Sequence, residues 1–266
     1  MLFSPFLSKM LNRNQQDYLR TNMLSQEELN RYDRQLLIPE IGREGQERLK
    51  KAKVFVAGAG GLGSPVLIYL AVAGIGHIRI ADHGVVAPTN LNRQILHWSK
   101  DIGRLKVDSA REKLSEINPD VKVEIINKTI NEKNISSMTD GFEAIVDAMD
   151  NFPARYILNR AAVERKIPFF HGAVRGFEGR AMTVIPGKTA CLRCMHHSSP
   201  PAEQSPVLGA TPGVVASIQV TEVIKYFTGM GELLTNRLLI YDGISMTFGE
   251  FQLKRNPECD HCGVKR

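Results

Sequence analysis

The sequence lacks the long hydrophobic runs and dense charge clusters that mark membrane proteins and nucleic-acid-binding proteins. No run of about 18 apolar residues occurs anywhere in the chain, so we expect no membrane-spanning helix. The net charge is +6, but no run of Lys and Arg exceeds three residues, so we expect no nucleic acid partner. A diffuse positive charge suits an anionic small molecule or an acidic protein equally well.

The amino terminus also lacks the features of a secretion signal. Residues 1–16 include a short apolar run, but they contain Pro5, have no positive amino-terminal region and offer no cleavage site of small residues. We therefore expect a cytoplasmic protein. Residues 1–24 are interpreted as an appendage, with Met23 as an alternative start. Residues 25–266 are interpreted as one continuous domain, because neither an internal repeat nor a long linker divides them.

Strand-like and helix-like patterns alternate through the first two thirds of the chain. We expect helices at 25–37, 45–51, 64–74, 107–117 and 153–166, and strands at 53–60, 77–82, 121–127, 143–150 and 167–174. This alternation predicts an α/β fold with a Rossmann-like, doubly wound parallel sheet. After Gly176, strand patterns at 180–186, 237–243 and 246–253, with one helix at 212–229, predict an antiparallel second half of the same sheet.

A glycine-rich loop follows the first of these strands, in the sequence KVFVAGAGGLGSP at residues 53–65. Gly58, Gly60, Gly61 and Gly63 let the backbone approach a phosphate, and free amides at the start of the next helix attract an anion. Gly58-x-Gly60-x-x-Gly63, with Asp82 at the end of the next strand, also fits the dinucleotide fingerprint. Taken alone, this loop leaves NAD and ATP open and favours NAD.

The polar residues after the later strands favour ATP instead. Arg93 and Lys106 follow the second strand of the expected sheet, and Asp150 closes a later strand one helical turn before Arg155. In open α/β sheets, ligands bind at the carboxyl ends of the strands, where these residues are expected. Arg93 and Lys106 would neutralise phosphate oxygens, and Asp150 would hold Mg²⁺.

The chain closely resembles the ThiF/MoeB/HesA family, relatives of the ubiquitin-activating enzymes. The motifs RYDRQLLIPEIG, GAGGLGSP, the run from Asp82 to Gln94, GRLK, DAMDN and two C-x-x-C pairs occur in the family order. The resemblance extends from about Ser25 to Cys262 and implies a ThiF-type adenylation domain. Members of this family adenylate the carboxyl-terminal glycine of ubiquitin-like sulfur carriers, in molybdopterin, thiamine or related biosynthesis.

The resemblance also implies residue roles. Besides the loop glycines, it implies that ATP or its metal is contacted by Asp82, Thr89, Asn90, Leu91, Asn92, Arg93, Lys106, Asp150 and Asn151. Arg34 matches an arginine that reaches the phosphates across a homodimer interface, and Arg155 matches one near the nucleotide and the Gly-Gly tail of the carrier. Arg34, Arg93, Lys106, Asp150 and Arg155 form the expected catalytic set. They would act by positioning and charge neutralisation, so we expect no general base.

The four cysteines form two C-x-x-C pairs, Cys191/Cys194 and Cys259/Cys262. Two such pairs without other thiols predict a closed, structural Cys₄ zinc site. Four unrelated buried thiols, a redox pair, or replacement of one sulfur by His261 are the alternatives, and the family resemblance favours four cysteine ligands.

The segment 195–213 holds no cysteine, although many relatives carry one there. We expect His196 and His197 in this segment to be solvent-exposed rather than catalytic. The enzyme is therefore predicted to stop at the acyl-adenylate and to pass it to a separate sulfur donor. An NAD-dependent oxidoreductase and a catalytically silent binding module remain as other interpretations. Retention of Arg34, Arg93, Lys106 and Asp150 argues against the silent module.

Overall fold

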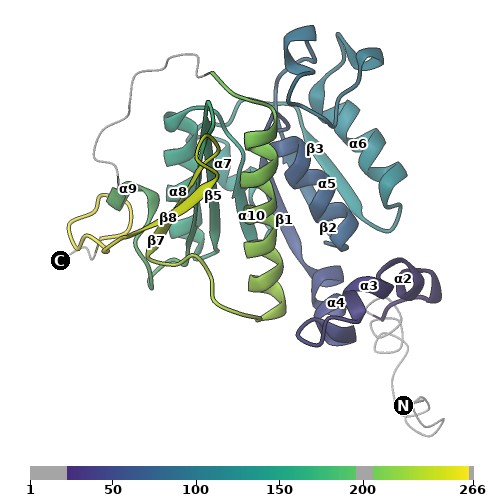
Figure 1. Cartoon of the computed structure of the whole chain (residues 1–266), viewed down its shortest axis with the longest axis horizontal. Coiled ribbons are helices and arrows are strands. Elements are labelled where there is room, and N and C mark those ends of the chain that lie inside the picture. The colour runs from purple at the N-terminus through teal and green to yellow at the C-terminus, as the bar shows by residue number, and fades with distance from the viewer. Residues whose placement is uncertain (1–22, 196–205, 264–266) are drawn as a thin grey trace, which may run out of the picture.

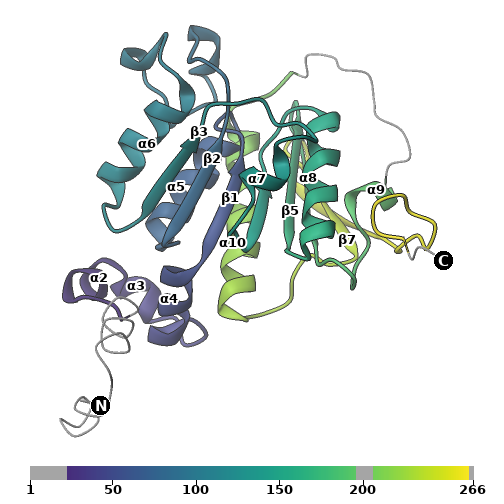
Figure 2. The same cartoon turned by 180° about the vertical axis from the view of Figure 1, so that it is seen from behind.

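An eight-stranded mixed sheet forms the centre of the protein, with helices on both faces (Figures 1 and 2). The structure is a computed structural model and describes residues 23–195 and 206–263. The strand order is β3-β2-β1-β4-β5-β6-β7-β8. Residues 1–22 of the expected appendage, and His196 and His197, lie outside the described residues.

The first five strands in the chain are parallel, and the remaining three are antiparallel. The strands are β1 (Lys53–Ala57), β2 (His77–Ala81), β3 (Lys122–Ile126), β4 (Ala144–Asp147), β5 (Phe169–Arg175), β6 (Glu178–Val184), β7 (Arg237–Asp242) and β8 (Thr247–Gln252). The prediction of a doubly wound α/β sheet with an antiparallel second half is therefore confirmed. The chain crosses from β3 to β4 over β1, so the topological switch point lies between β1 and β4.

The helices cover the two faces of the sheet in separate groups. They are α2 (Gln26–Arg31), α3 (Asp33–Leu36), α4 (Gly42–Lys51), α5 (Gly63–Ala73), α6 (Lys106–Ile117), α7 (Ile135–Met138), α8 (Phe152–Arg165), α9 (Leu192–Met195) and α10 (Ala210–Thr228), with 3₁₀ helices η2 (Pro88–Asn90) and η3 (Ser99–Asp101). Helices α5, α6 and α10 pack on one face, and α7 and α8 on the other (Figures 1 and 2). Within the described ranges, none of the helices combines the length and hydrophobicity needed to cross a bilayer.

The central strand β1 shows why its sequence is a continuous apolar run. Val54 and Val56 belong to the core that lies under α5 and α10, whereas Phe55 and Ala57 belong to the core under α8. Successive side chains of a strand point to opposite faces, so a strand covered on both faces is apolar at every position.

Three segments end or break where the sequence pattern does not predict it. The expected helix 25–37 divides into α2 and α3 at Tyr32, whose buried hydroxyl accepts a hydrogen bond from Asn118 Nδ2 at 2.9 Å. The expected strand 143–150 ends at Asp147, because its carboxylate accepts the Met149 N–H at 3.0 Å and turns the chain. The strand expected at 53–60 ends at Ala57, because Gly58 adopts a φ of +103°.

The short elements α7, α9, η2 and η3 were not predicted. Each has only three or four residues. A helical periodicity of 3.6 residues cannot be recognised over so short a segment.

The parallel strands begin at one edge of the sheet, the amino-terminal edge, and end at the other, the carboxyl-terminal edge. These two edges carry different parts of the chain. Helices α2 to α4 lie at the amino-terminal edge of the parallel strands, below β1 in Figure 1. There Gln46 Nε2 donates to the Ala73 carbonyl at the end of α5, at 2.9 Å. The loops after β1, β2 and β4 therefore meet at the opposite, carboxyl-terminal edge.

The close contact between Gly63 and the backbone of Gly58 gives a prediction about stability. A Cβ atom at Gly63 would overlap the carbonyl oxygen of Gly58, which is backbone and cannot rotate away. Gly63→Ala should lower the free energy of unfolding by about 3 kcal/mol. Chemical denaturation would measure this loss.

Gly213 in α10 is the matched control, since a Cβ atom there meets nothing within 4 Å. Gly213→Ala should be neutral or stabilise by up to about 1 kcal/mol. Equal stability of the Gly63→Ala and wild-type proteins would contradict the packing described for the loop.

Candidate functional site

The glycine loop contains two closely packed glycines and two whose Cβ positions would make only ordinary van der Waals contacts. A Cβ atom at Gly58 would lie 2.7 Å from the Ala148 carbonyl oxygen, so Gly58 and Gly63 keep the loop close to β4. Gly60 and Gly61 are half-buried, and their hypothetical Cβ atoms approach no atom closer than 3.5 Å. The backbone at Gly60 and Gly61 is therefore the part of the loop that a ligand can approach.

Asp82, at the end of β2, anchors this loop. Its Oδ2 accepts the Ala59 N–H at 2.8 Å, and its Oδ1 accepts the Gly84 N–H at 2.7 Å. The carboxylate thus joins the glycine loop to the segment that follows β2. Each oxygen keeps a further lone pair, which leaves Asp82 able to accept a hydrogen bond from a ligand.

The segment after β2 brings Arg93 to the glycine loop. The Arg93 Nη1 donates to the Thr89 carbonyl and to Asn92 Oδ1, both at 2.8 Å. Its aliphatic Cγ lies 3.5 Å from the position of a Cβ atom on Gly61. Asn90 Oδ1 accepts the Ala87 N–H at 3.0 Å and fixes the preceding turn, and the neighbouring Leu91 is half-buried. The Arg93 side chain is therefore held beside Gly61.

Lys106 begins α6 next to the same place. Its backbone N–H donates to the Gly84 carbonyl at 3.0 Å. A Cβ atom on Gly84 would lie 3.0 Å from Asp82 Oδ1 and 3.3 Å from Lys106 Nζ, so Gly84 separates the lysine from the aspartate. Arg93 and Lys106 thus bring two positive charges to the carboxyl edge of the sheet.

Asp150 lies on the turn after β4 and is exposed to solvent. Asn151 caps α8 by accepting the Ala154 N–H at 3.0 Å, and its Nδ2 donates to Asp150 Oδ1 at 3.1 Å. Arg155 is buried beneath this turn: its Nη2 donates to the Met149 carbonyl at 2.7 Å, and its Nε lies 3.7 Å from Asp147 Oδ2. In this arrangement Arg155 supports the turn that carries Asp150.

Arg34 lies away from the other residues predicted for the nucleotide site. It belongs to α3 at the amino-terminal edge of the sheet, and its side chain is 93% exposed. Its Nε lies 3.8 Å from a carboxylate oxygen of the adjacent Asp33. The loop glycines, Asp82, Arg93, Lys106 and Asp150 follow the carboxyl ends of β1, β2 and β4, and therefore lie at the opposite edge of the sheet.

Sequence reasoning missed several buried polar residues beside the loop. The hydroxyl of Ser64 and the Oε1 of Gln94 are buried and have no hydrogen-bond partner among residues 23–195 and 206–263. Gln94 Nε2 lies 3.7 Å from a Cβ position on Gly60. Buried polar groups are usually paired, so these two atoms fit a site that a polar ligand completes. Gln94 is the last residue of the motif that runs from Asp82 to Gln94, but nothing in the sequence distinguishes its role.

A second missed group lies under the turn that carries Asp150. Asp147 is fully buried, and its Oδ2 is hydrogen-bonded to His171 Nδ1 at 2.6 Å. Burial lowers the pKa of His171, although the adjacent carboxylate opposes this effect. Gln219 of α10 donates to the Asp147 carbonyl at 2.8 Å. These contacts join β4, β5 and α10 behind the site.

The four cysteines meet at one point, although the two pairs come from α9 and from the carboxyl-terminal end of the chain. Their Sγ atoms all lie within 4.8 Å of one another, with separations of 3.4, 3.7 and 3.9 Å for three of the pairs. Tetrahedral zinc with bonds of about 2.3 Å places sulfur atoms about 3.8 Å apart. The Asn256 N–H donates to Cys194 Sγ at 3.4 Å. His261 instead bonds Asn159 Nδ2 through its Nδ1, at 2.7 Å.

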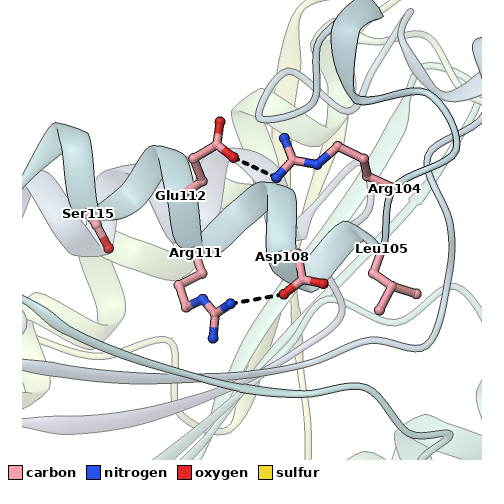
Figure 3. Close-up of a pocket in the computed structure, with 6 residues that line it drawn as sticks. All are labelled: Arg104, Leu105, Asp108, Arg111, Glu112 and Ser115. Atoms are coloured by element: carbon pink, nitrogen blue, oxygen red, sulfur yellow. Dashed lines mark hydrogen bonds and ion pairs between the residues drawn. The ribbon is translucent and has the colours of Figure 1, made fainter.

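A shallow pocket of about 460 Å³ lies along the outer face of α6 (Figure 3). It is lined by Arg104, Leu105, Asp108, Arg111, Glu112 and Ser115. Arg104 pairs with Glu112 at 2.5 Å and Arg111 with Asp108 at 3.1 Å, so the charges of the pocket neutralise one another. None of the predicted site residues lines this pocket.

Comparison with known proteins agrees with this geometry. The model of the family described as the ThiF family matches residues 32–261. The chain belongs to the ThiF family. It is 41% identical over 249 residues to the SAMP-activating enzyme E1 of Haloferax volcanii. The aligned region covers 91% of this chain and 92% of that protein. It is 39% identical to the sulfur carrier protein adenylyltransferase of Thermus thermophilus, covering 90% of this chain and 92% of that protein.

A longer relative and a solved structure extend the comparison. The probable adenylyltransferase/sulfurtransferase MoeZ of Mycobacterium tuberculosis is 41% identical over 88% of this chain, which covers 62% of that protein. The crystal structure of E. coli MccB with ATP superposes with a TM-score of 0.81 over 96% of this chain and 82% of that chain, at 24% identity. This likeness supports the ThiF-type fold.

Proposed function

We propose that this ThiF-family chain is an adenylyltransferase that uses MgATP to activate the carboxyl-terminal glycine of a ubiquitin-like sulfur carrier protein. The names of two relatives that it matches over 92% of their length support this activity. The observation that carries the proposal is the placement of Arg93 beside Gly61 and of Lys106 beside Gly84, next to the topological switch point. Two cations suit a triphosphate better than the two linked phosphates of a dinucleotide.

The proposed reaction needs little covalent chemistry from side chains. The carboxylate of the carrier attacks the α-phosphorus of ATP, pyrophosphate leaves, and an acyl-adenylate forms. Because a carboxylate is already ionised at neutral pH, no general base is required. Backbone amides near Gly60 and Gly61 would receive the phosphates, Asp150 would hold Mg²⁺, and Arg93 and Lys106 would neutralise the oxygens that gain charge.

The position of Arg34 supports a homodimer. Arg34 lies on α3 at the amino-terminal edge of the sheet, whereas the glycine loop follows β1 at the carboxyl-terminal edge (Figure 1). The neighbouring Leu37 and Ile38 are also exposed, as expected for residues that a second copy covers. In this proposal Arg34 completes the phosphate site of the partner subunit.

The acyl-adenylate would pass to a separate sulfur donor. The sequence contains four cysteines, and all four belong to the sulfur cluster. Thiolates that bind zinc in a closed site are poor nucleophiles, so no thiol remains to form a thioester with the carrier. MoeZ is named as both an adenylyltransferase and a sulfurtransferase, and this chain matches 62% of its length.

The sulfur cluster is proposed to hold structural zinc. The sulfur separations fit tetrahedral coordination, and the Asn256 N–H stabilises the Cys194 thiolate. That hydrogen bond lowers the pKa of Cys194, against the opposing effect of burial. The metal would join the carboxyl-terminal end of the chain to α9.

Asp150 provides the first test of the proposed activity. Asp150→Ala should reduce carrier-dependent exchange between ATP and pyrophosphate by about 100-fold, because the metal-bound phosphates lose their anchor. The matched control is Asp140→Ala, another exposed aspartate that instead pairs with Arg165 at 2.7 Å. Asp140→Ala should keep wild-type exchange. An Asp150→Ala protein as active as wild type would refute the assignment.

Mixing two inactive variants tests the role of Arg34 across the dimer. Arg34→Ala and Asp150→Ala subunits should each be inactive alone, whereas their heterodimer contains one intact site of two. Random subunit exchange then predicts about a quarter of wild-type activity in an equal mixture. Arg43→Ala, at an exposed arginine of α4, should be active alone. If the mixture remains inactive although heterodimers form, Arg34 does not act in trans.

Removal of a cysteine ligand should affect folding before chemistry. Cys259→Ser is expected to lose the zinc, measured by elemental analysis of the purified chain, and to unfold at a lower temperature. His261→Ala should keep one zinc per chain, because His261 bonds Asn159 and not the metal. Full zinc content in Cys259→Ser, or its loss in His261→Ala, would contradict the Cys₄ assignment.

A further inference from the structure

A line of buried polar side chains lies directly beneath the glycine loop. His97, in the segment between η2 and η3, is only 3% exposed, and both of its ring nitrogens are hydrogen-bonded. Nε2 lies 2.8 Å from the Ala59 carbonyl oxygen, and Nδ1 lies 2.9 Å from Ser109 Oγ. Lys113 Nζ donates to Ser109 Oγ at 2.8 Å and to Asp101 Oδ2 at 2.5 Å.

The partners fix the direction of every hydrogen bond in this line. A carbonyl oxygen only accepts, so the Nε2 of His97 carries a proton and donates to Ala59. Burial lowers the pKa of His97, which favours the neutral ring. In the neutral ring Nδ1 accepts the hydroxyl proton of Ser109, and the Ser109 oxygen in turn accepts from Lys113. Each of these groups is therefore satisfied without water.

The line joins the two parts of the site that must hold ATP. Ala59 lies between Gly58 and Gly60, and its N–H is already held by Asp82. Ser109 lies on α6, one turn after Lys106. The single ring of His97 therefore spans from the backbone of the loop to the helix that carries the lysine.

We propose that His97 is a positioning residue that sets the placement of the glycine loop relative to Lys106 during adenylation. The inference rests on the proposed function and names a residue that touches neither substrate. Charge neutralisation at a transferring phosphoryl group depends on the position of each donor, and misplacement by about 1 Å costs up to about 100-fold in rate. An ordinary core histidine would contribute stability but would leave the rate of the folded enzyme unchanged.

Two substitutions separate the two hydrogen bonds of His97. In His97→Asn the amide oxygen stands near the position of Nδ1 and can accept from Ser109, but the side chain is too short to reach Ala59. In His97→Gln the longer side chain carries an N–H toward the Ala59 carbonyl. His97→Asn should lower the kcat of carrier-dependent exchange by about 10- to 100-fold, which is the cost expected when the loop is misplaced relative to Lys106. The KM for ATP should stay within about threefold, and His97→Gln should recover most of the lost kcat.

Stability is controlled with a buried hydrogen bond far from the site. Thr139→Val removes the bond from Thr139 Oγ1 to the Ile135 carbonyl, at 2.8 Å, near the amino-terminal edge of the sheet. It should lower the unfolding temperature and leave kcat at the wild-type value. If His97→Asn does not fold, His97→Met, which has the length of Gln but no N–H for the Ala59 carbonyl, should show the same fall in kcat.

The readouts distinguish this inference from the proposed function. Exchange by the wild-type protein tests the adenylyltransferase activity itself, and its absence would refute that activity. If the wild type is active, a wild-type kcat in His97→Asn overturns the positioning role. The positioning role is also overturned if His97→Asn and His97→Gln lose kcat equally and the loss only tracks the fall in unfolding temperature. A selective fall in kcat, recovered by Gln, supports it.

Discussion

The close approach of Gly58 to Gly63 and to Ala148 is the constraint on which the rest of the site depends. The backbone turns there from β1 into α5 with no room for a side chain, so the loop lies close to β4 at the switch point of the sheet. Asp82 and His97 then hold the two polar groups of Ala59, from β2 and from the segment before α6. The loop is therefore fixed from both sides before any nucleotide binds, as electrostatic preorganisation requires.

The sheet separates the functions of the protein between its two edges. Arg93, Lys106 and Asp150 gather at the carboxyl-terminal edge, because the loops after parallel strands meet there. Arg34 lies at the opposite edge, on short helices that are held by Tyr32 and Gln46 against the ends of α6 and α5. If Arg34 serves the phosphate site as proposed, one chain alone leaves that site incomplete, and a second copy would complete it.

Much of this arrangement was predictable from local patterns, and the remainder depends on contacts between distant residues. Apolar runs and the glycine spacing predict the alternating strands and helices and the loop, and two C-x-x-C pairs predict the sulfur cluster, because each signal is contained in a short segment. The break at Tyr32 depends on Asn118, far along the chain, and no local pattern reports it. His97 follows an apolar pair and is easily taken for a core residue. Its importance became visible only when the fold brought Ala59 and Ser109 to its two nitrogens.

This nucleotide site is proposed to transfer AMP to a protein carboxylate. This transfer is tested most directly by intact-mass measurement of small carrier proteins that end in Gly-Gly, after incubation with the enzyme and MgATP without a sulfur donor. The account predicts a carrier whose mass increases by one adenylyl group, with no covalent adduct between carrier and enzyme. An unmodified carrier across the whole panel, together with tight binding of NAD by the same protein, would contradict it.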